Sequence, residues 1–489
     1  MPPPQSPRHP VDARPVRLLP RPGHLARQRL HLHGTAPRPA AQFAASLAAG
    51  SARHGLLPQN QPPRLRAGGR LRTVSHPPRG LPPHRRRQLM TFTLLLDLDD
   101  TLLDNDMEAF VPAYLQALSG YMAQHSPPQR FAQTLLAATR KMMENRRPDR
   151  TLEETFSTAF YPALGLSAET LRPEIETFYR QVFPSLQRVT RPRPAAPALV
   201  ETALERGWRV VIATNPLFPR TAIEQRLAWA GLPVGEYPFA LVTSFETFHF
   251  TKAVPAYYAE ILGRLGWPKD PLLMAGNDPD LDLRPAQKAG LPVFWVTAPP
   301  KSGTSPLATD GCGPLDSLPS WLAARAPVSL TGRFETLEAA LATLRATPAV
   351  LDTWTRRLPA EAWRVSPPEG WSVVETICHL RDSDLEINLP RLQTALQKDN
   401  PFLPAVDADA WVDERNYRCE DGPQAVRRFI EIRMRLLSLL DALPPQAFRR
   451  PVRHGIFGPS TLEELVVFMA GHDRMHLRTL HALLSPLTG

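Results

Sequence analysis

The chain has 489 residues and a formal net charge of +10, and that charge is concentrated at its start. Residues 1–90 hold 16 Arg, no Lys and one acid and carry +15, so the remaining 399 residues are at −5. The length excludes one ordinary core and predicts two or three units. Because the later residues are acidic overall, nucleic acid is not an expected partner of the folded units.

The cysteine spacings and the lengths of the apolar runs indicate the cellular compartment of the protein. Cys312, Cys378 and Cys419 stand at unrelated spacings, which excludes a disulfide framework and a thiolate metal cluster. No apolar run approaches the ~18 residues of a membrane span, and the Met1 end lacks the apolar core of a secretory signal. We therefore expect a cytoplasmic protein without a membrane partner.

The leader, residues 1–89, contains 17 prolines and no sustained apolar period. This composition is typical of a disordered segment. Two alternatives stay open: an organelle transit peptide, which the proline density opposes, and a misassigned start with Met90 as the true first residue. Nucleic-acid binding by the leader rests only on its Arg density.

From residue 91 the pattern alternates between strands and helices. TFTLLLDLDD is a short apolar run that ends in carboxylates, as in a buried parallel strand, and residues 107–183 have helical period. Further strands are predicted at 209–213, 239–243, 271–275 and 293–297, separated by helices at 195–206, 219–230, 253–265 and 282–289. This α/β order predicts a doubly wound parallel sheet over residues 90–299.

The second half predicts an all-α unit. Residues 300–329 are rich in Pro, Gly and Ser and predict a linker, and no strand signal follows them. Helical period at 334–357, 372–398, 422–443 and 460–484 predicts a four-helix bundle over 330–489. Ser372 with Glu375, and Ser460 with Glu463, are candidate capping boxes of its second and fourth helices.

Asp97 and Asp99 leave the first strand at positions i and i+2, so both face one side of its end. A carboxylate nucleophile needs a neighbouring acid/base that protonates the leaving oxygen and then activates water. This pair supplies both groups, with Asp97 as the nucleophile.

Four segments in order resemble the haloacid dehalogenase superfamily. They are Asp97–Thr101 (DLDDT), Thr214-Asn215, Lys252 in FTK, and GNDPDLD with Asp278 and Asp282. The resemblance implies that the hydroxyl of Thr214 holds the phosphoryl group, and that Lys252 stabilises charge on the nucleophile and the phosphoryl oxygens. Any one of these residues alone would more often be a solvated loop charge.

The same resemblance implies a Mg²⁺ site and a cap. Asp97, the Asp99 carbonyl and Asp278 suit Mg²⁺, and Asp282 is expected to orient the ion from nearby. Asn277 departs from the common glycine-aspartate opening of the fourth segment. The helices at about 105–190 resemble the cap that closes over the site in one branch of the superfamily.

The identity of residue 99 distinguishes two classes of enzyme within the superfamily. Its dehalogenases lack this acid/base, because a halide leaves without a proton, whereas its phosphatases keep an aspartate. The resemblance therefore favours a phosphohydrolase acting on a small phosphorylated substrate over a dehalogenase.

Three histidines form a second constellation. His472 and His476 stand at i and i+4 in GHDRMHL, so both imidazoles project from one helix face. His379 lies mid-way along the second bundle helix and can reach the same pocket in an antiparallel bundle. Surface histidines beside Asp473 and Arg474 are the alternative interpretation.

These segments resemble the DinB-like superfamily, through Trp371-Ser372, Glu375, His379, Asp382, FGPSTLEEL and HDRMH over about 330–485. The resemblance implies a three-histidine site with an open position, which suits Zn²⁺, Ni²⁺ or Fe²⁺. Trp354, Trp363 and Trp371 are predicted to be packing residues.

Two functional hypotheses follow. The leading one is a Mg²⁺-dependent phosphohydrolase fused to a metal-binding bundle. In the alternative, the amino-terminal unit is weak or silent and the bundle carries a metal-dependent thiol or small-molecule transfer. A homodimer through the bundle is left open.

Overall fold

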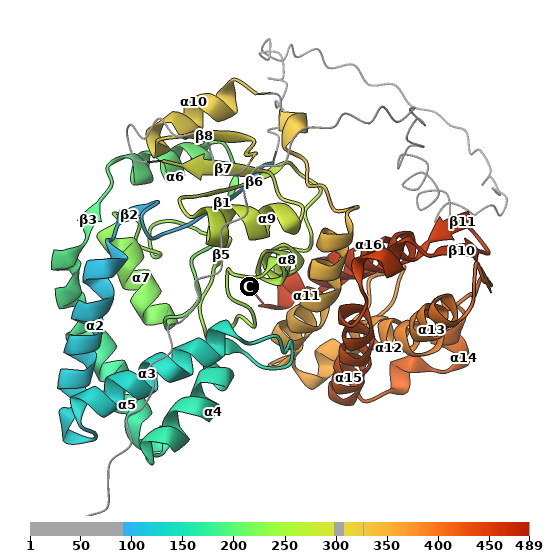
Figure 1. Cartoon of the computed structure of the whole chain (residues 1–489), viewed down its shortest axis with the longest axis horizontal. Helices are drawn as coiled ribbons and strands as arrows, with labels where there is room; N and C mark the ends of the chain where they lie inside the picture. The colour runs from blue at the N-terminus through green and yellow to red at the C-terminus, as the bar shows by residue number, and fades with distance from the viewer. Residues whose placement is uncertain (1–90, 298–307, 326, 489) are drawn as a thin grey trace, which may run out of the picture. The chain divides into compact units, whose positions relative to one another are not determined.

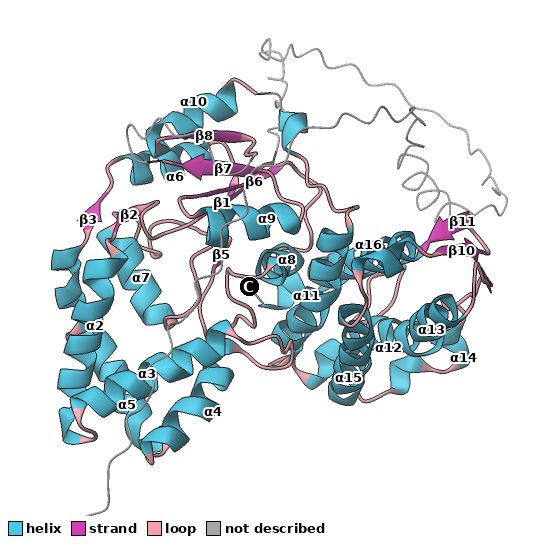
Figure 2. Cartoon of the chain, viewed as in Figure 1, coloured by secondary structure: helices cyan, strands magenta, loops and turns pink. Residues whose placement is uncertain are grey.

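The computed structural model describes residues 91–297, 308–325 and 327–488. The leader predicted to be disordered, residues 1–89, and Met90 lie outside these ranges. Within them, the predicted order of an α/β sheet followed by a helical bundle is confirmed (Figures 1 and 2). Among the helices of these ranges, none has both the length and the apolar character that a bilayer crossing requires.

The sheet has six parallel strands in the order β5-β4-β1-β6-β7-β8. In chain order they are β1 (Thr93–Leu96), β4 (Arg209–Ile212), β5 (Leu241–Val242), β6 (Leu272–Gly276), β7 (Val293–Val296) and β8 (Gly311–Gly313). Leu95 of β1 aligns with Val211 on one side and Met274 on the other. β1 therefore lies between β4 and β6, whose carboxyl ends flank its own.

Helices cover both faces of the sheet, because successive strand residues point to opposite sides. Leu94 and Leu96 face one apolar cluster, and Leu95 faces another. The core helices are α6 (Ala195–Glu205), α7 (Arg220–Trp229), α8 (Pro255–Arg264), α9 (Arg284–Lys288) and α10 (Leu318–Ala323). The first cluster includes α6, α7 and α10, and the second includes α8 and α9.

The prediction of a linker at 300–329 is wrong for most of the residues that the structure describes there. Residues 311–313 form β8, which pairs with β7 as the sixth strand, and Leu318 of α10 is fully buried. A Cβ on Gly311 would lie 2.3 Å from the Trp321 ring, so glycine is what lets α10 pack on this edge strand. The α/β unit therefore extends past residue 299.

Four α-helices lie in the insertion between β2 and β3: α2 (Met107–Tyr121), α3 (Pro128–Met143), α4 (Leu152–Leu164) and α5 (Ala168–Gln181). We call them the cap. A two-stranded antiparallel ribbon of β2 (Leu103–Asp104) and β3 (Arg191–Pro192) joins the chain entering the cap to the chain leaving it. Thr151 and Glu154 form a capping box that fixes the start of α4.

The carboxyl-terminal unit is the predicted four-helix bundle. Its helices are α11 (Leu337–Thr355), α12 (Val373–Asp382) continued through a π-helix (Ser383–Asn388) into α13 (Leu389–Gln397), α15 (Gly422–Asp441) and α16 (Leu462–Thr488), with the short α14 (Trp411–Glu414) between α13 and α15. The capping box at Ser372 and Glu375 is confirmed. The other begins one residue later than predicted, at Thr461 with Glu464.

A small sheet in the bundle was not predicted. Its strands are β9 (Phe402–Leu403), β10 (Pro451–His454) and β11 (Gly458–Thr461). They are two to four residues long, and β10 and β11 form a tight hairpin with Gly458 at a φ of 74°. Such short strands carry too little alternation to be read from sequence.

One apolar cluster continues from the sheet into the bundle. It joins Leu95 and Met274 of the strands to Val350 of α11 and Leu480 of α16, through α8. α8 and α11 pack so closely that a Cβ on Gly263 would lie 2.6 Å from Val350 Cγ2. Glycine at this point permits the contact, and the two units share a core rather than a flexible tether.

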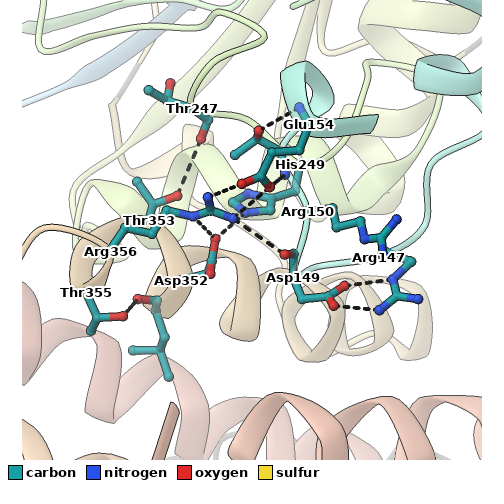
Figure 3. A network of polar contacts seen from close by, with 12 residues as sticks. Arg147, Asp149, Arg150, Glu154, Thr247, His249, Asp352, Thr353, Thr355 and Arg356 are labelled. Atoms are coloured by element: carbon teal, nitrogen blue, oxygen red, sulfur yellow. Dashed lines mark hydrogen bonds and ion pairs between the residues drawn. The ribbon is translucent and has the colours of Figure 1, made fainter. Parts of the chain in front are cut away.

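A polar network ties the cap, the sheet unit and the bundle together (Figure 3). His249 Nδ1 lies 2.8 Å from Glu260 Oε1 on α8, and its Nε2 lies 2.9 Å from Asp352 Oδ2 on α11. Arg356, which directly follows α11, donates to the same Asp352 and, through two nitrogens, to Glu154 of the cap. The first helix of the bundle is thus bonded to both other parts.

The charge of His249 makes this network sensitive to pH. Burial lowers the pKa of His249, but Glu260 and Asp352 outweigh it and raise the pKa from 6.5 to about 9. The imidazolium stabilises the folded chain fully below about pH 6.5, and this contribution disappears as the pH rises through about 9. The difference in unfolding free energy between wild type and His249→Gln should shrink by about 3 kcal/mol from about pH 6 to about pH 10. Urea unfolding at both pH values measures it, and a constant difference would contradict an ionised His249.

Candidate active site and metal centre

The residues predicted for phosphoryl transfer gather at the carboxyl edge of the sheet. Asp97 follows β1 directly, Thr214 follows β4, Lys252 lies beyond β5 and Asp282 beyond β6. Neighbouring parallel strands end at the same edge, so residues 155 positions apart meet there. Asp97, Lys252 and Asp282 are in direct contact.

Lys252 is the buried centre of this group. Its Nζ donates to Asp97 Oδ1, and to Asp282 Oδ1 at 2.5 Å. Burial lowers the pKa of Lys252, but the charges of Asp282 and Asp97 outweigh it and raise the pKa above its ordinary value. The ammonium therefore stays protonated and holds Asp97 in one orientation.

Asp282 organises the loop after β6. Its Oδ2 accepts from the backbone N–H of Asp278 at 3.0 Å while its Oδ1 holds Lys252. Burial and the charge of Asp97 raise the pKa of Asp282 to about 7, whereas Lys252 acts in the opposite direction. A Cβ on Gly276 would lie 2.4 Å from Asp282 Oδ2, so only glycine fits there. Both oxygens of Asp282 are committed, which agrees with an orienting role.

Asn277, rather than the predicted ligand Asp278, faces the nucleophile. The Asn277 amide lies 3.1 Å from Asp97 Oδ2 and 3.0 Å from the Asp99 carbonyl oxygen. The Asp278 carboxylate instead accepts from the N–H groups of Asp280 and Leu281, at 2.8 and 3.1 Å, and caps the next turn. Sequence spacing did not reveal which of the two side chains faces Asp97.

The oxygens around Asn277 fit a Mg²⁺ ion. With its amide oxygen facing Asp97 Oδ2 and the Asp99 carbonyl, Asn277 completes three oxygens on one corner of the site. Adjacent ligands of an octahedral ion at about 2.1 Å stand about 3 Å apart, and these separations are of that size. In the reverse orientation the amide nitrogen donates to both groups, so the contact persists without an ion.

Asp99 is held by different partners from those of Asp97. Asn105 Nδ2 donates to its Oδ1 at 2.8 Å, and Arg226 of α7 forms an ion pair with the same oxygen. The Arg226 guanidinium is buried over the rings of Phe110 and Phe218, 5.5 and 5.2 Å away, and burial lowers its pKa to about 10. The two carboxylates of the DxD pair therefore occupy distinct environments.

Sequence reasoning missed Arg226, although α7 carried a signal. Ala222, Ile223 and Leu227 form its buried stripe, and Arg226 lies on that stripe rather than on the solvent face. A charged residue there must find a buried partner.

Thr214 and Asn215 lie close to this group. The carbonyl of Thr214 accepts from Thr243 Oγ1 at 2.8 Å and from the Tyr257 hydroxyl at 2.6 Å, which fixes the strand end. Its own Oγ1 is buried without a hydrogen-bond partner. Asn215 Oδ1 accepts from the Lys252 backbone N–H at 3.4 Å. The hydroxyl of Thr214 therefore has a hydrogen bond left to donate.

The bundle brings the three predicted histidines together. His472 Nε2 lies 3.0 Å from both His379 Nε2 and His476 Nε2, and one ligand atom from each falls within 4.8 Å of the others. Burial lowers the pKa of all three imidazoles, to about 4 at His472. Neutral, converging nitrogens are what a divalent transition metal requires. The surface alternative for His472 and His476 is wrong, because His476 is buried and His472 is half-buried against the other two imidazoles.

The surroundings of the histidines hold them in place. Trp371 lies against this cluster, with its ring 4.7 Å from that of His379 and 5.7 Å from that of His476. Arg433 of α15 pairs with Asp384 at 2.6 Å and with Asp473, the residue after His472, at 3.0 Å. This buried triad joins α15 to α16 and to the π-helix that continues α12. Trp371 is thus a wall of the site, and not only the packing residue that was predicted.

Comparisons with known proteins divide the chain in the same way. The sequence model of the haloacid dehalogenase-like hydrolases matches residues 93–290, and that of the DinB superfamily matches residues 343–480. The comparison with curated proteins finds no match.

Three solved structures are similar to parts of the chain. The 2-haloacid dehalogenase from Pseudomonas syringae pv. Tomato DC3000 is 20% identical, covering 48% of this chain and 100% of its own, with a TM-score of 0.35. The HAD phosphatase from Thermococcus onnurineus is 16% identical, covering 48% and 98%, with a TM-score of 0.32. The four-helix bundle YfiT from Bacillus subtilis is 18% identical, covering 41% and 98%, with a TM-score of 0.29.

The two family matches confirm both resemblances that the motifs indicated, and they cover successive parts of the chain. The chain joins a haloacid dehalogenase-like hydrolase domain to a DinB superfamily domain.

Proposed function

We propose that the first domain hydrolyses phosphate monoesters with Mg²⁺, and that Asp97 and Asp99 do so in separate roles. The observation that carries this proposal is the separation of their partners. Asp97 is bonded to Lys252, whereas Asp99 is bonded to Asn105 and Arg226. A halide needs no proton on leaving, so an oriented second carboxylate favours an oxygen leaving group.

In the first step, a carboxylate oxygen of Asp97 attacks phosphorus in line with the ester oxygen. The new Asp97 O–P bond forms as the P–O ester bond breaks. Asp99 enters this step protonated, gives its proton to the departing alkoxide and is left as the carboxylate that Asn105 and Arg226 hold. Lys252 and the free hydroxyl of Thr214 stabilise the phosphoryl oxygens. A bound Mg²⁺, held by Asp97, the Asp99 carbonyl and Asn277, would supply further positive charge to these oxygens.

In the second step, the Asp99 carboxylate takes a proton from water, and the resulting hydroxide attacks phosphorus. The Asp97 O–P bond breaks, inorganic phosphate leaves and both carboxyl groups return to their starting states. Throughout, Asp282 keeps Lys252 in place by sharing its ammonium with Asp97.

The direct test is an assay of the full chain with p-nitrophenyl phosphate and Mg²⁺, beside one with 2-chloropropionate. We expect phosphate release that needs Mg²⁺ and no chloride release. Chloride release without phosphate release would overturn the proposal in favour of dehalogenation.

The position of Asn277 makes a separate prediction about the ion. Asn277→Asp adds a charged ligand beside Asp97 and the Asp99 carbonyl, so the Mg²⁺ concentration for half-maximal activity should fall about tenfold. Asp278→Asn is the matched control, because an asparagine can still cap residues 280 and 281. Mg²⁺ titrations of both variants decide between the neighbours, and a shift only in Asp278→Asn would restore Asp278 as the ligand.

The histidine cluster favours a second activity, a metal-dependent thiol or small-molecule transfer in the bundle. Three neutral imidazoles leave a coordination position for a substrate or water, and Zn²⁺, Ni²⁺ and Fe²⁺ accept such a set. Metal analysis of the purified full chain is the first test, and absence of any transition metal after reconstitution would remove this activity.

A further inference from the structure

The cap lines a cavity that the proposed chemistry does not account for. Its volume is about 440 Å³, and its walls come from all four cap helices and from the loops that follow β4 and β5. In Figure 1, α2 and α5 of the cap lie near α7, whose Arg226 pairs with Asp99. The cavity therefore borders the edge of the sheet that carries Asp97.

The walls are mainly apolar and aromatic. They include Leu118, Phe131, Leu135, Phe156, Phe160 and Tyr179. Phe160 packs edge-on against Phe131 at 5.4 Å and is stacked with Phe156 at 4.6 Å, so flat ring faces and edges are presented to an occupant.

The charged groups in the wall do not favour a second anion. The charged wall residues are three acids, Glu153, Glu176 and Glu246, and two arginines, Arg172 and Arg180, so their formal sum is −1. Arg172 is paired with Glu153, and Arg180 donates to the Thr177 hydroxyl. The wall therefore offers an additional phosphate or carboxylate no excess of positive charge.

Two chains of contact connect the cavity to Asp99. Met107, a wall residue, accepts through its sulfur from Asn105 Nδ2, which also donates to Asp99 Oδ1. Phe218, another wall residue, lies under the Arg226 guanidinium that pairs with Asp99. Two wall residues thus contact the two partners of Asp99, the acid/base that would protonate the leaving oxygen.

We propose that the substrate is a monophosphate of an aromatic alcohol with more than one ring, and that the ring system of its leaving group fills this cap cavity. The proposal rests on the proposed phosphohydrolase function. An apolar cavity of about 150 Å³ holds one benzene ring, so a cavity of about 440 Å³ leaves a single ring loosely held.

The test uses the full chain with 2-naphthyl phosphate, and with acetyl phosphate as a substrate too small to fill the cavity. Ser157→Phe places a ring in the cavity from α4, where Ser157 lines the wall. Thr158→Phe, on the exposed neighbouring position of the same helix, is the matched control. Thr139→Phe fills the cavity from α3 and is a second variant in case the first does not fold.

We expect kcat/KM for 2-naphthyl phosphate to fall about tenfold or more in Ser157→Phe and Thr139→Phe, with acetyl phosphate little changed. Thr158→Phe should behave as wild type. Equal losses for both substrates in folded filling variants, or none for 2-naphthyl phosphate, would overturn the proposal.

Binding of 2-naphthol, measured by its fluorescence, tests the ligand class of the cavity separately from the phosphohydrolase function. If wild type binds 2-naphthol and Ser157→Phe does not, but neither phosphate is hydrolysed, the proposed function fails while the ligand class of the cavity stands. If acetyl phosphate is hydrolysed but 2-naphthol does not bind, the reverse holds.

Discussion

Replacing Asp97 with Asn in the full chain is expected to lower kcat for p-nitrophenyl phosphate at least about 10,000-fold. The amide that replaces the carboxylate cannot form the aspartyl phosphate, which is an acyl phosphate. In the described ranges the other carboxylate that contacts Lys252 is that of Asp282, whose second oxygen is held by the Asp278 N–H. The fold should survive, because Lys252 keeps Asp282 as its partner. Steady-state rates with Mg²⁺ and the midpoint of thermal unfolding measure the two effects.

Asp100→Asn is the matched control for this variant. Asp100 belongs to the same loop and accepts from the Asn105 N–H at 2.9 Å, a bond that an asparagine can keep. Its φ of 55° is one that asparagine tolerates. Most activity should remain, and an Asp97→Asn variant as active as Asp100→Asn would exclude Asp97 as the nucleophile.

The strands of the sheet were predictable because each central strand is a short apolar run. β1, β4, β6 and β7 follow this pattern, and the chemistry-bearing residues stand directly after such runs. β8 has no such signal, since its residues are Gly-Cys-Gly and its place depends on pairing with β7 and on Trp321. From composition alone, β8 was therefore predicted to be part of a linker.

The site residues that were not predicted from the sequence depend on side-chain orientation and on contacts between distant segments. Asn277 and Asp278 are neighbours in one loop, and the bond from Asp282 to the Asp278 N–H decides which of them faces Asp97. The partner of Arg226, by contrast, comes from a segment 127 residues away in the chain. Neither of these two contacts can be inferred from the spacing of residues in a sequence motif.

Helical period predicted the bundle but not what it packs against. α11 is buried on almost every side between residues 339 and 351, because it contacts α8 on one side and α15 and α16 on others. A helix that is apolar all round is an internal helix. That pattern was the available signal that the two domains share a core.

His472→Ala is expected to remove tightly bound transition metal from the bundle, weakening its affinity about 100-fold or more, because two imidazoles remain of three. His481→Ala is the matched control, since it lies on the same helix, packs on Trp354 and is outside the cluster. Metal content of the reconstituted full-length variants measures the loss.

The same pair of variants tests whether the metal stabilises the folded chain. A ligand that binds only the folded state raises the unfolding temperature, so a chelator should lower it in wild type and in His481→Ala but not in His472→Ala. α16 also packs against α8 of the hydrolase domain. The shift in unfolding temperature should therefore appear for both domains together rather than for the bundle alone. Equal chelator shifts in all three proteins would mean that the ion binds elsewhere.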